Sequence, residues 1–183
     1  MISILYAGNK LSHHGYTPGV IETLGPLLET EGYRVFYAGT KKNQVLRLAE
    51  MLFRTLTRGR KADYILIDTY STSAFWYAYL IGRLANMLGK KYIPILHGGD
   101  LPSRIKKSKR ACDRLFLKSY FNVAVSGYLE HEFAKAGYRT TVIPNSIDIA
   151  KYTFRLRDHT RPQLLWVRSF HRQYNPNGSR CAC

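Results

Sequence analysis

The sequence predicts a doubly wound α/β domain built around a parallel sheet, and two observations carry this prediction. Short runs of β-branched, aliphatic and aromatic residues alternate with amphipathic helical segments from residue 2 to residue 143. Within this pattern, residues 121–143 hold a strand, a helix of about ten residues and a second strand in direct succession. Such a βαβ unit implies parallel strands joined by a right-handed crossover.

The first half of the chain predicts three strands, at residues 2–7, 33–37 and 63–67, and two helices between them. The first helix opens at Thr17 and Pro18, because proline suits the first helical position, and Gly32 ends it. Gly25 and Pro26 should kink this helix. Its buried face is expected at Ile21, Leu24 and Leu28. The second helix is expected over residues 45–56, before a basic turn at residues 58–61.

The second half predicts a helix over residues 71–88, a strand over 92–96, a helix over 105–118 and the final βαβ unit. In that unit the strands are expected at residues 121–125 and 140–143. Ser126 is placed to cap the helix between them, and Gly137 is placed to end it. The helix over 71–88 should be heavily buried through Phe75, Trp76, Tyr79, Leu80, Leu84 and Leu88.

Length and charge limit the classes of protein. A chain of 183 residues can bury roughly 70% of its unfolded surface, which is enough for one sizeable core. Lys and Arg number 28 against 12 Asp and Glu, so the net charge is 28 − 12 = +16. This excess predicts an anionic partner, namely nucleic acid, a lipid surface or a phosphorylated substrate. The alternative is a solvated basic surface with no specific partner.

The cysteines and the N-terminus indicate a cytoplasmic protein. Three cysteines, two of them within the last three residues, do not form the pattern of a disulfide scaffold. The first residues, M-I-S-I-L-Y-A-G-N, lack the basic leader and apolar run of a signal peptide. No run approaches the roughly 18 apolar residues of a membrane-spanning helix. We therefore expect a cytoplasmic location, with peripheral contact to the cytoplasmic membrane face as an extension.

The end of the βαβ unit carries a resemblance to a known family. Residues 142–148 read V-I-P-N-S-I-D after a serine-capped helix and a short strand. This resembles the V-I-P-N-G-I-D loop of glycosyltransferase family 4, of GT-B architecture, with Ser146 where glycine is usual. The resemblance implies that residues 1–148 are the N-terminal, acceptor-side Rossmann-like domain and residues 149–162 the interdomain linker. Residues 163–183 would be a truncated start of the donor domain with an unstructured tail.

This resemblance implies a function that the residues alone do not specify. A family 4 enzyme would transfer a sugar from a UDP- or GDP-linked donor to a glycan, polyprenyl-linked or lipid acceptor, with retention. No cofactor is expected in this chain, and we expect it to be inactive alone, because the donor site belongs to the second domain. The alternative class is a basic nucleic-acid-binding α/β module, favoured by the +16 charge and 14 tyrosines. No nucleic-acid motif is present, so nucleic acid is the less favoured partner.

His97 is the candidate catalytic residue. It follows a strand of apolar residues, and Gly98 and Gly99 after it would let a ligand approach the backbone closely. The resemblance implies that a histidine at this strand end lines the reaction centre. Alternatively, His97 is a loop histidine bonded to the backbone. Asp100 is read first as a helix N-cap, with a ligand contact as the second interpretation.

The first loop is the second candidate region. It contains neither a P-loop nor a G-x-G-x-x-G pattern, but the resemblance implies that it helps to bind the acceptor and the donor phosphate. His13 and His14 have no Cys or carboxylate neighbours in sequence, so no metal site is expected. Arg168 is a weak candidate for the donor phosphate. The acceptor and donor-phosphate candidates are Gly8, Asn9, Lys10, Gly15, Tyr16, Gly98, Asp100 and Asn145.

A basic segment at residues 104–118 is the third candidate region. In the predicted helix its cations surround a narrower apolar stripe that includes Ile105 and Leu115. Each cation near an anionic leaflet contributes about 1 kcal/mol of attraction, so several together can hold a domain at a membrane. The alternative is a solvated helix packed by its apolar stripe alone. The predicted patch comprises Arg104, Lys106, Lys107, Lys109, Arg110 and Arg114.

Overall fold

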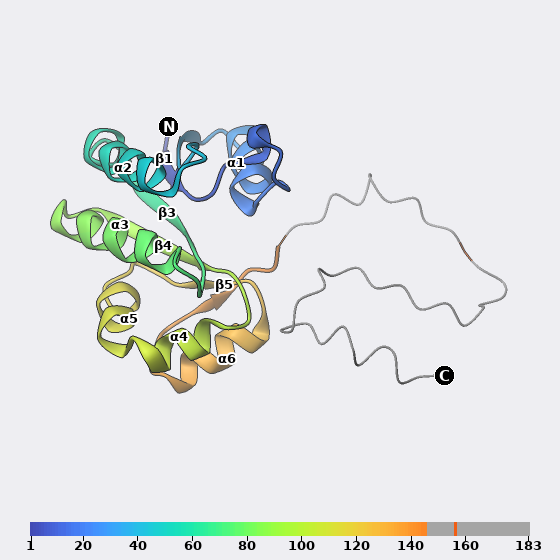
Figure 1. Cartoon of the computed structure of the whole chain (residues 1–183), viewed down its shortest axis with the longest axis vertical. Helices are drawn as coiled ribbons and strands as arrows, with labels where there is room; N and C mark the ends of the chain where they lie inside the picture. The colour runs from blue at the N-terminus through green and yellow to red at the C-terminus, as the bar shows by residue number, and fades with distance from the viewer. Residues whose placement is uncertain (146–155, 157–183) are drawn as a thin grey trace. The chain divides into compact units, whose positions relative to one another are not determined.

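The structure is a computed structural model that describes residues 1–145 and residue 156 (Figure 1). The described residues form a six-stranded sheet in which every neighbouring pair is parallel. The strand order is β2-β1-β3-β4-β5-β6, which confirms the predicted α/β fold with a parallel sheet. The strands are β1 Ser3–Ala7, β2 Arg34–Ala38, β3 Tyr64–Thr69, β4 Lys91–Leu96, β5 Val123–Ala124 and β6 Thr141–Val142.

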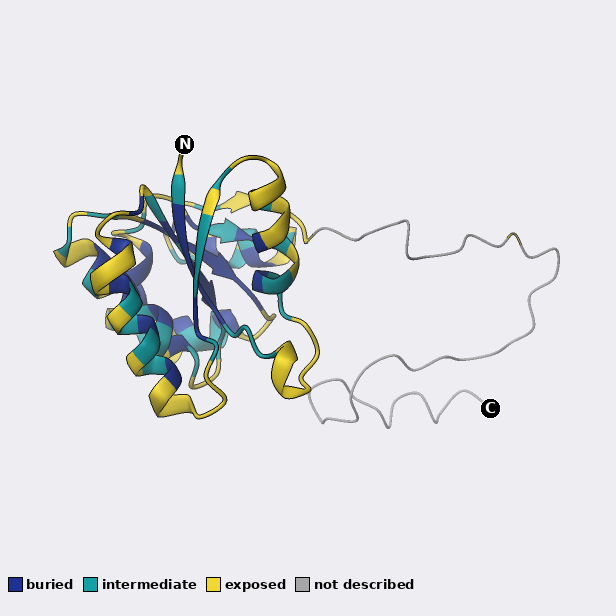
Figure 2. Cartoon of the chain, turned by 90° about the horizontal axis from the view of Figure 1, so that it is seen from above, coloured by how far each residue is buried: buried dark blue, intermediate teal, exposed yellow. Residues whose placement is uncertain are grey.

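Helices cover the two faces of the sheet unequally (Figure 2). The helices are α1 Val20–Thr30, α2 Gln44–Arg54, α3 Phe75–Met87, α4 Leu101–Lys107, α5 Lys109–Phe116 and α6 Gly127–Lys135. Residues of α2 through α6 pack into one large core with the sheet, and we call that side the closed face. On the other side α1 packs by itself against Tyr6 and Ile95 among the described residues, and we call that side the α1 face.

The strand order explains this asymmetry. From β1 the chain steps outward to β2, crosses back to β3, and then moves steadily away through β4, β5 and β6. Because each crossover between parallel strands is right-handed, reversing the direction of travel moves the connecting helix to the opposite face. The reversal lies between β1 and β3, so this is the switch point of the sheet. Ligands of open parallel sheets bind at such a point, outside the carboxyl ends of the strands.

The buried side of α3 differs from the prediction. Trp76 and Leu80 are 44% and 38% exposed, so the expected burial of these residues is wrong. The reason is close packing, because a Cβ atom on Gly82 would lie 2.6 Å from Leu115 Cδ1 in α5. Small side chains therefore face α5 at this point, and Trp76 and Leu80 turn outward. The buried residues of α3 are Phe75, Ala78, Ile81, Gly82 and Ala85.

The start of α1 also differs from the prediction. The helix begins at Val20 rather than at Thr17, because the Glu22 carboxylate accepts the backbone N–H of Gly19 at 3.0 Å and fixes the first turn there. Pro26 lies inside the helix, which continues to Thr30. The predicted end is confirmed, since Gly32 has a left-handed φ of 87°.

The predicted single helix over residues 105–118 is wrong. The segment forms α4 and α5, which are separated at Ser108, where φ is −139° and ψ is 44°. A helical periodicity of apolar residues continues through this break, so the pattern alone did not reveal it. The second helix lies where it was predicted: α2 ends at Arg54, and a π-helical turn at Thr55–Gly59 follows it directly.

The final βαβ unit matches its prediction in order and type. Ser126 Oγ accepts the N–H of Leu129 at 3.4 Å and caps α6, and Gly137 has a φ of 85° just past its end. The strands are shorter than expected, at two residues each. Apart from residue 156, the predicted linker at 149–162 and the predicted segment at 163–183, with Arg168, lie outside the described residues.

Candidate active site

Three strand ends meet at the carboxyl edge of the sheet beside the switch point. β1 ends before Gly8 and Asn9, β3 carries Asp68 as its next-to-last residue, and β4 runs directly into His97. The N–H of His97 donates to the Thr69 carbonyl at 2.8 Å, which extends the pairing of β3 with β4 by one step. The parallel register therefore places side chains from three strands at one edge.

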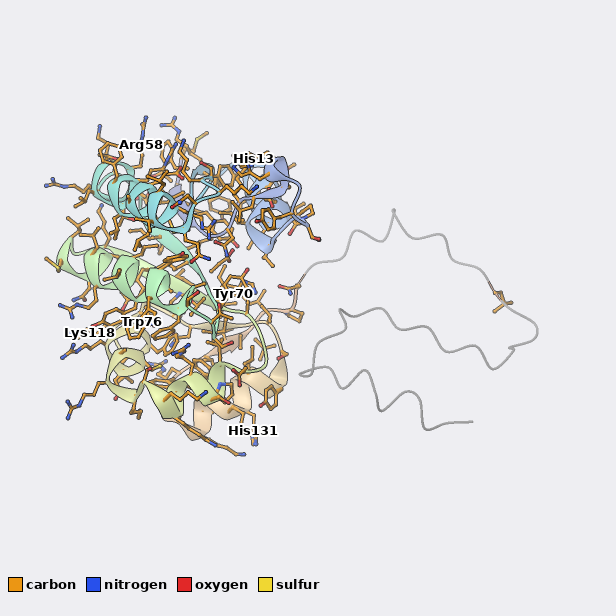
Figure 3. All side chains as sticks on the ribbon, viewed as in Figure 1. His13, Arg58, Tyr70, Trp76, Lys118 and His131 are labelled. Atoms are coloured by element: carbon orange, nitrogen blue, oxygen red, sulfur yellow. The ribbon has the colours of Figure 1, made fainter. Side chains whose placement is uncertain are left out.

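The centre of this edge is a buried hydrogen-bonded cluster. His97 Nε2 lies 3.0 Å from Asp68 Oδ1, and the Tyr6 hydroxyl donates to the same oxygen at 3.0 Å. The side chains of His97 and Asp68 are 7% and 1% exposed. The ring of Tyr70 (Figure 3) stacks on the His97 imidazole with centroids 5.1 Å apart. We call Tyr6, Asp68, Tyr70 and His97 the histidine cluster.

Burial raises the pKa of the two phenols in the histidine cluster. Desolvation, together with the charge and the hydrogen bond of Asp68, raises the pKa of Tyr6 well above its ordinary value. Desolvation and Asp68 also raise the pKa of Tyr70. Both hydroxyls therefore keep their protons at neutral pH. Tyr6 is a permanent donor to Asp68.

Two buried oxygen atoms on one side of the histidine cluster have no hydrogen-bond donor within residues 1–145. Asp68 Oδ2 and Asn9 Oδ1 are buried and accept no hydrogen bond from the described residues. Both residues line a cavity of about 10 Å³ between the end of β1 and the closed-face helices α2 and α3. Such a volume holds about one water molecule. A sugar ring is far larger, so a sugar ligand belongs outside this cavity.

The arrangement pairs an imidazole with a buried carboxylate. Histidine is the side chain most often used to transfer protons in catalysis, and a carboxylate bonded to the ring orients it. The described residues contain no group of three or more His, Cys, Asp or Glu side chains arranged to hold a metal ion. At the ligand edge of the parallel sheet, a histidine is thus paired with a buried carboxylate.

Comparison with family models adds the class of enzyme. The model of Glycosyltransferase Family 4 matches residues 3–151, which is most of the chain. The chain belongs to glycosyltransferase family 4. A search of curated proteins gives no match. The family 4 domain thus coincides with the parallel sheet and includes all of the histidine cluster.

The predicted ligand loop of this family 4 domain lies at the same edge but does not bond to His97. The N–H of Gly8 donates to the Ala38 carbonyl at 3.0 Å, which ties the end of β1 to the end of β2. The Lys10 ammonium lies over the Tyr37 ring, 3.8 Å from its centroid. Gly15 and Gly98 have left-handed φ angles of 83° and 89°. No hydrogen bond within residues 1–145 joins these residues to the imidazole.

The remaining candidates lie apart from the histidine cluster. Tyr16 is exposed in the first loop, and Asp100 occupies the N-cap position of α4 without a capping bond from its side chain. Asn145 lines a groove of about 560 Å³ on the α1 face, beside Pro144 and Val125. The structure therefore separates a buried group, His97 with Asp68, from loop residues with exposed or backbone contacts.

The three members of the histidine cluster other than His97 were absent from the sequence prediction, although a signal existed for Asp68 and Tyr6. Asp68 is the charged residue at the end of an apolar strand, and Tyr6 carries a polar group within an otherwise apolar one. Polar atoms at these positions need hydrogen-bond partners once buried. The sequence therefore showed that both side chains need hydrogen-bond partners. It did not show that they pair with each other, because this depends on the register between strands about sixty residues apart.

The predicted cationic patch of this family 4 domain is divided by the break at Ser108. The guanidinium of Arg104 donates to the Ser71 carbonyl at 2.8 and 2.6 Å, so this side chain is half-buried against the loop after β3. Lys109 forms an ion pair with Asp113 at 2.6 Å. Lys106, Lys107, Arg110 and Arg114 are exposed. No helix within the described residues has the length and apolar character needed to span a bilayer.

Proposed function

We propose that this chain is the acceptor-side part of a retaining glycosyltransferase that uses a UDP- or GDP-linked sugar. The acceptor is a glycan, a polyprenyl-linked intermediate or a lipid. In the transfer, the bond between the anomeric carbon and the donor phosphate oxygen breaks, and a bond from that carbon to the acceptor hydroxyl oxygen forms. The hydroxyl proton leaves with the released nucleoside diphosphate or to solvent.

One observation carries this proposal. In a family 4 domain, His97 stands at the carboxyl end of β4, one strand from the switch point, and bonds to the buried Asp68. This edge is where ligands of open parallel sheets bind. Histidine at such a position serves as a proton-handling or charge-stabilising group for a sugar hydroxyl or phosphate.

The loops around His97 supply backbone contacts in this proposal. Gly15 and Gly98 have no side chain that would keep a phosphate or sugar from the backbone, and Lys10 adds a positive charge. Gly8 shapes this loop from beneath, because its N–H is bonded to Ala38 and Asp68 takes the space of a side chain. Asn9, Tyr16, Asp100 and Asn145 would offer polar contacts to the acceptor from neighbouring loops. Donor phosphate binding is assigned mainly to a second domain, so we expect the chain alone to transfer no sugar.

The exposed cations of α4 and α5 extend this proposal to a membrane. We propose that Lys106, Lys107, Arg110 and Arg114 attract an anionic leaflet on the cytoplasmic face, where a lipid-linked acceptor resides. A Lys106/Lys107→Gln double variant should lose liposome binding at low salt, whereas the Lys41/Lys42→Gln variant, with equally exposed lysines after β2, should retain it. Equal loss in both variants would reduce the effect to net charge.

The catalytic proposal is tested by replacing His97. In a two-domain version, with the donor-binding domain of another family 4 enzyme following residue 145, His97→Ala should lower kcat by roughly a hundredfold or more. Circular dichroism checks that the variant folds. Rates equal to those of the unsubstituted protein would remove His97 from the reaction centre. If the unsubstituted two-domain version is inactive with every donor but binds RNA in a salt-dependent way, the nucleic-acid alternative gains instead.

A further inference from the structure

We propose that Asp68 is a positioning residue for His97 in sugar transfer, and that Gly8 is required because its missing side chain leaves room for the Asp68 carboxylate. This inference rests on the proposed role of His97 at the reaction centre. It assigns a second function to the first loop, which is to seat a carboxylate beneath the histidine in addition to contacting a ligand.

The hydrogen bonds determine which ring nitrogen of His97 carries a proton. In this inference Asp68 is an ionised carboxylate, which only accepts hydrogen bonds, so both neighbours of its Oδ1 donate to it. Tyr6 donates through its hydroxyl, and we assign the ring donor at 3.0 Å from Oδ1 to His97 Nε2–H. In the neutral imidazole Nδ1 therefore holds the free lone pair, and in the charged ring Nδ1 carries the second N–H. Asp68 thus assigns Nδ1 as the atom that meets a sugar hydroxyl or phosphate.

The orientation of the ring is fixed by contacts on several sides. Its Nε2 lies 3.0 Å from Asp68, its flat side stacks on Tyr70 at an interplanar angle of 27°, and its backbone is bonded to Thr69. With 7% of the side chain exposed, the ring has little space for another rotamer. Without Asp68, the strongest directional contact of the ring is lost, and the polar edge of the ring is free to turn.

The need for Gly8 is one of space. A Cβ atom at this position would overlap Asp68 Oδ2 and would lie 2.9 Å from Asp68 Cγ. The backbone of Gly8 is held in this place by its hydrogen bond to Ala38 in β2. Gly8 is not among the glycines with a left-handed φ, so the backbone conformation itself admits other residues. An alanine at residue 8 would therefore act by displacing the carboxylate.

The first test observes the proton directly in the chain of residues 1–183. In ¹H–¹⁵N NMR spectra, His97 should show an imidazole Nε2–H signal that exchanges slowly with water, because the bond to Asp68 is buried. Asp68→Ala should abolish this signal, and Gly8→Ala should weaken it. Gly99→Ala is the matched control, because a Cβ atom there meets only Tyr128, at 3.9 Å. A neutral ring with its proton on Nδ1 and none on Nε2, or a Nε2–H signal unchanged in Asp68→Ala, would overturn the inference.

The second test separates positioning from substrate binding. In the two-domain version described above, Asp68→Asn keeps the side-chain volume and removes the charge. It should lower kcat about tenfold to a thousandfold and leave KM within about twofold, because Asp68 acts through His97. Combining Asp68→Asn with His97→Ala should add no further loss. A change in KM alone, or a full additional loss in the double variant, would contradict the inference.

The outcomes also distinguish this inference from the proposed function. If His97→Ala leaves the rate unchanged, the catalytic role of His97 fails, whatever the NMR spectra show. If His97→Ala lowers kcat and Asp68→Asn does not, His97 keeps its role and the positioning by Asp68 fails. Should Asp68→Asn not fold, Tyr6→Phe is the substitute, because it removes one donor to Asp68 Oδ1 and keeps the aromatic ring. It should then lower kcat by a smaller factor without raising KM.

Discussion

The two faces of the sheet carry similar side chains but are covered very differently. On the closed face, Ile65 and Ile67 of β3 are 0% and 1% exposed under helices α2 and α3. On the α1 face, Leu66 of the same strand and Ile93 of the next strand are half-buried and line the groove of about 560 Å³. Alternate residues of one strand thus experience two environments. The difference lies in topology, because the strand order places one crossover on the α1 face.

The histidine cluster lies at the strand ends, where the two faces meet. Tyr6 packs with Ile21 of α1 and Ile95 of β4 on the α1 face, and its hydroxyl leads to Asp68 and His97 at the strand ends. Buried polar groups are costly unless they are hydrogen-bonded, and the closed face consists largely of apolar packing. Asp68 and Tyr70 also line the small cavity beside α2 and α3. The closed face therefore supplies most of the apolar core, and the polar groups gather at the edge between the faces.

The largest expected effect tests the closed face. Phe133 of α6 is fully buried and packs edge-to-face on Phe116 with ring centroids 5.0 Å apart. Phe133→Ala should lower the free energy of unfolding by about 3–5 kcal/mol, because it removes an aromatic ring from a close-packed core. Tyr128→Ala, on the exposed side of the same helix, is the matched control and should cost about 0.5 kcal/mol or less. Urea titration measures both, and similar losses would show that the closed face is not the main core.

An intermediate effect is expected where α1 meets the sheet. A Cβ atom on Gly25 would overlap the Tyr37 ring of β2, so helix α1 depends on a glycine for its distance from the strand. Gly25→Ala gains about 1 kcal/mol of helix propensity but forces α1 or Tyr37 to move, and the net loss of stability should be about 1–2 kcal/mol. Gly127→Ala, in a helical position with open space, should be neutral or stabilising. A stabilised Gly25→Ala would mean that α1 packs loosely.

The order of elements could be predicted from the sequence, because each strand and helix is encoded locally. Ser126 and Gly137 define α6 through capping bonds within a few residues of one another. The break at Ser108 and the outward turn of Trp76 could not be predicted, since both depend on contacts between α3, α4 and α5. The periodicity of apolar residues shows which residues can be buried, but it does not show which helix packs against them.

The candidate site, like the fold, could be predicted only where the signal is local in the sequence. His97 could be found because a histidine followed by two glycines stands at a strand end. Its link to Asp68 and Tyr6 required the register of β1 with β3 and of β3 with β4. The need for space at Gly8 is visible only once Asp68 is in place. The sequence therefore identified the histidine, but not the side chains from other strands that contact it.

The smallest expected effect compares the two faces most directly. Ile65 of β3 and Ile93 of β4 lie on neighbouring strands one step apart in register, and they point to opposite faces. Ile→Val removes one methylene at each position and keeps the β-branched shape that strands favour. On the closed face, Ile65→Val should lower the free energy of unfolding by about 1 kcal/mol, because the core cannot fill the space. On the α1 face, Ile93→Val should cost less than about 0.5 kcal/mol, since solvent already reaches the groove. Urea titration of the two variants, with one m-value fitted to both unfolding curves, measures the difference. An equal loss at both positions would show that the groove is covered in solution. The difference in burial between the two faces would then hold only when residues 1–145 are considered by themselves.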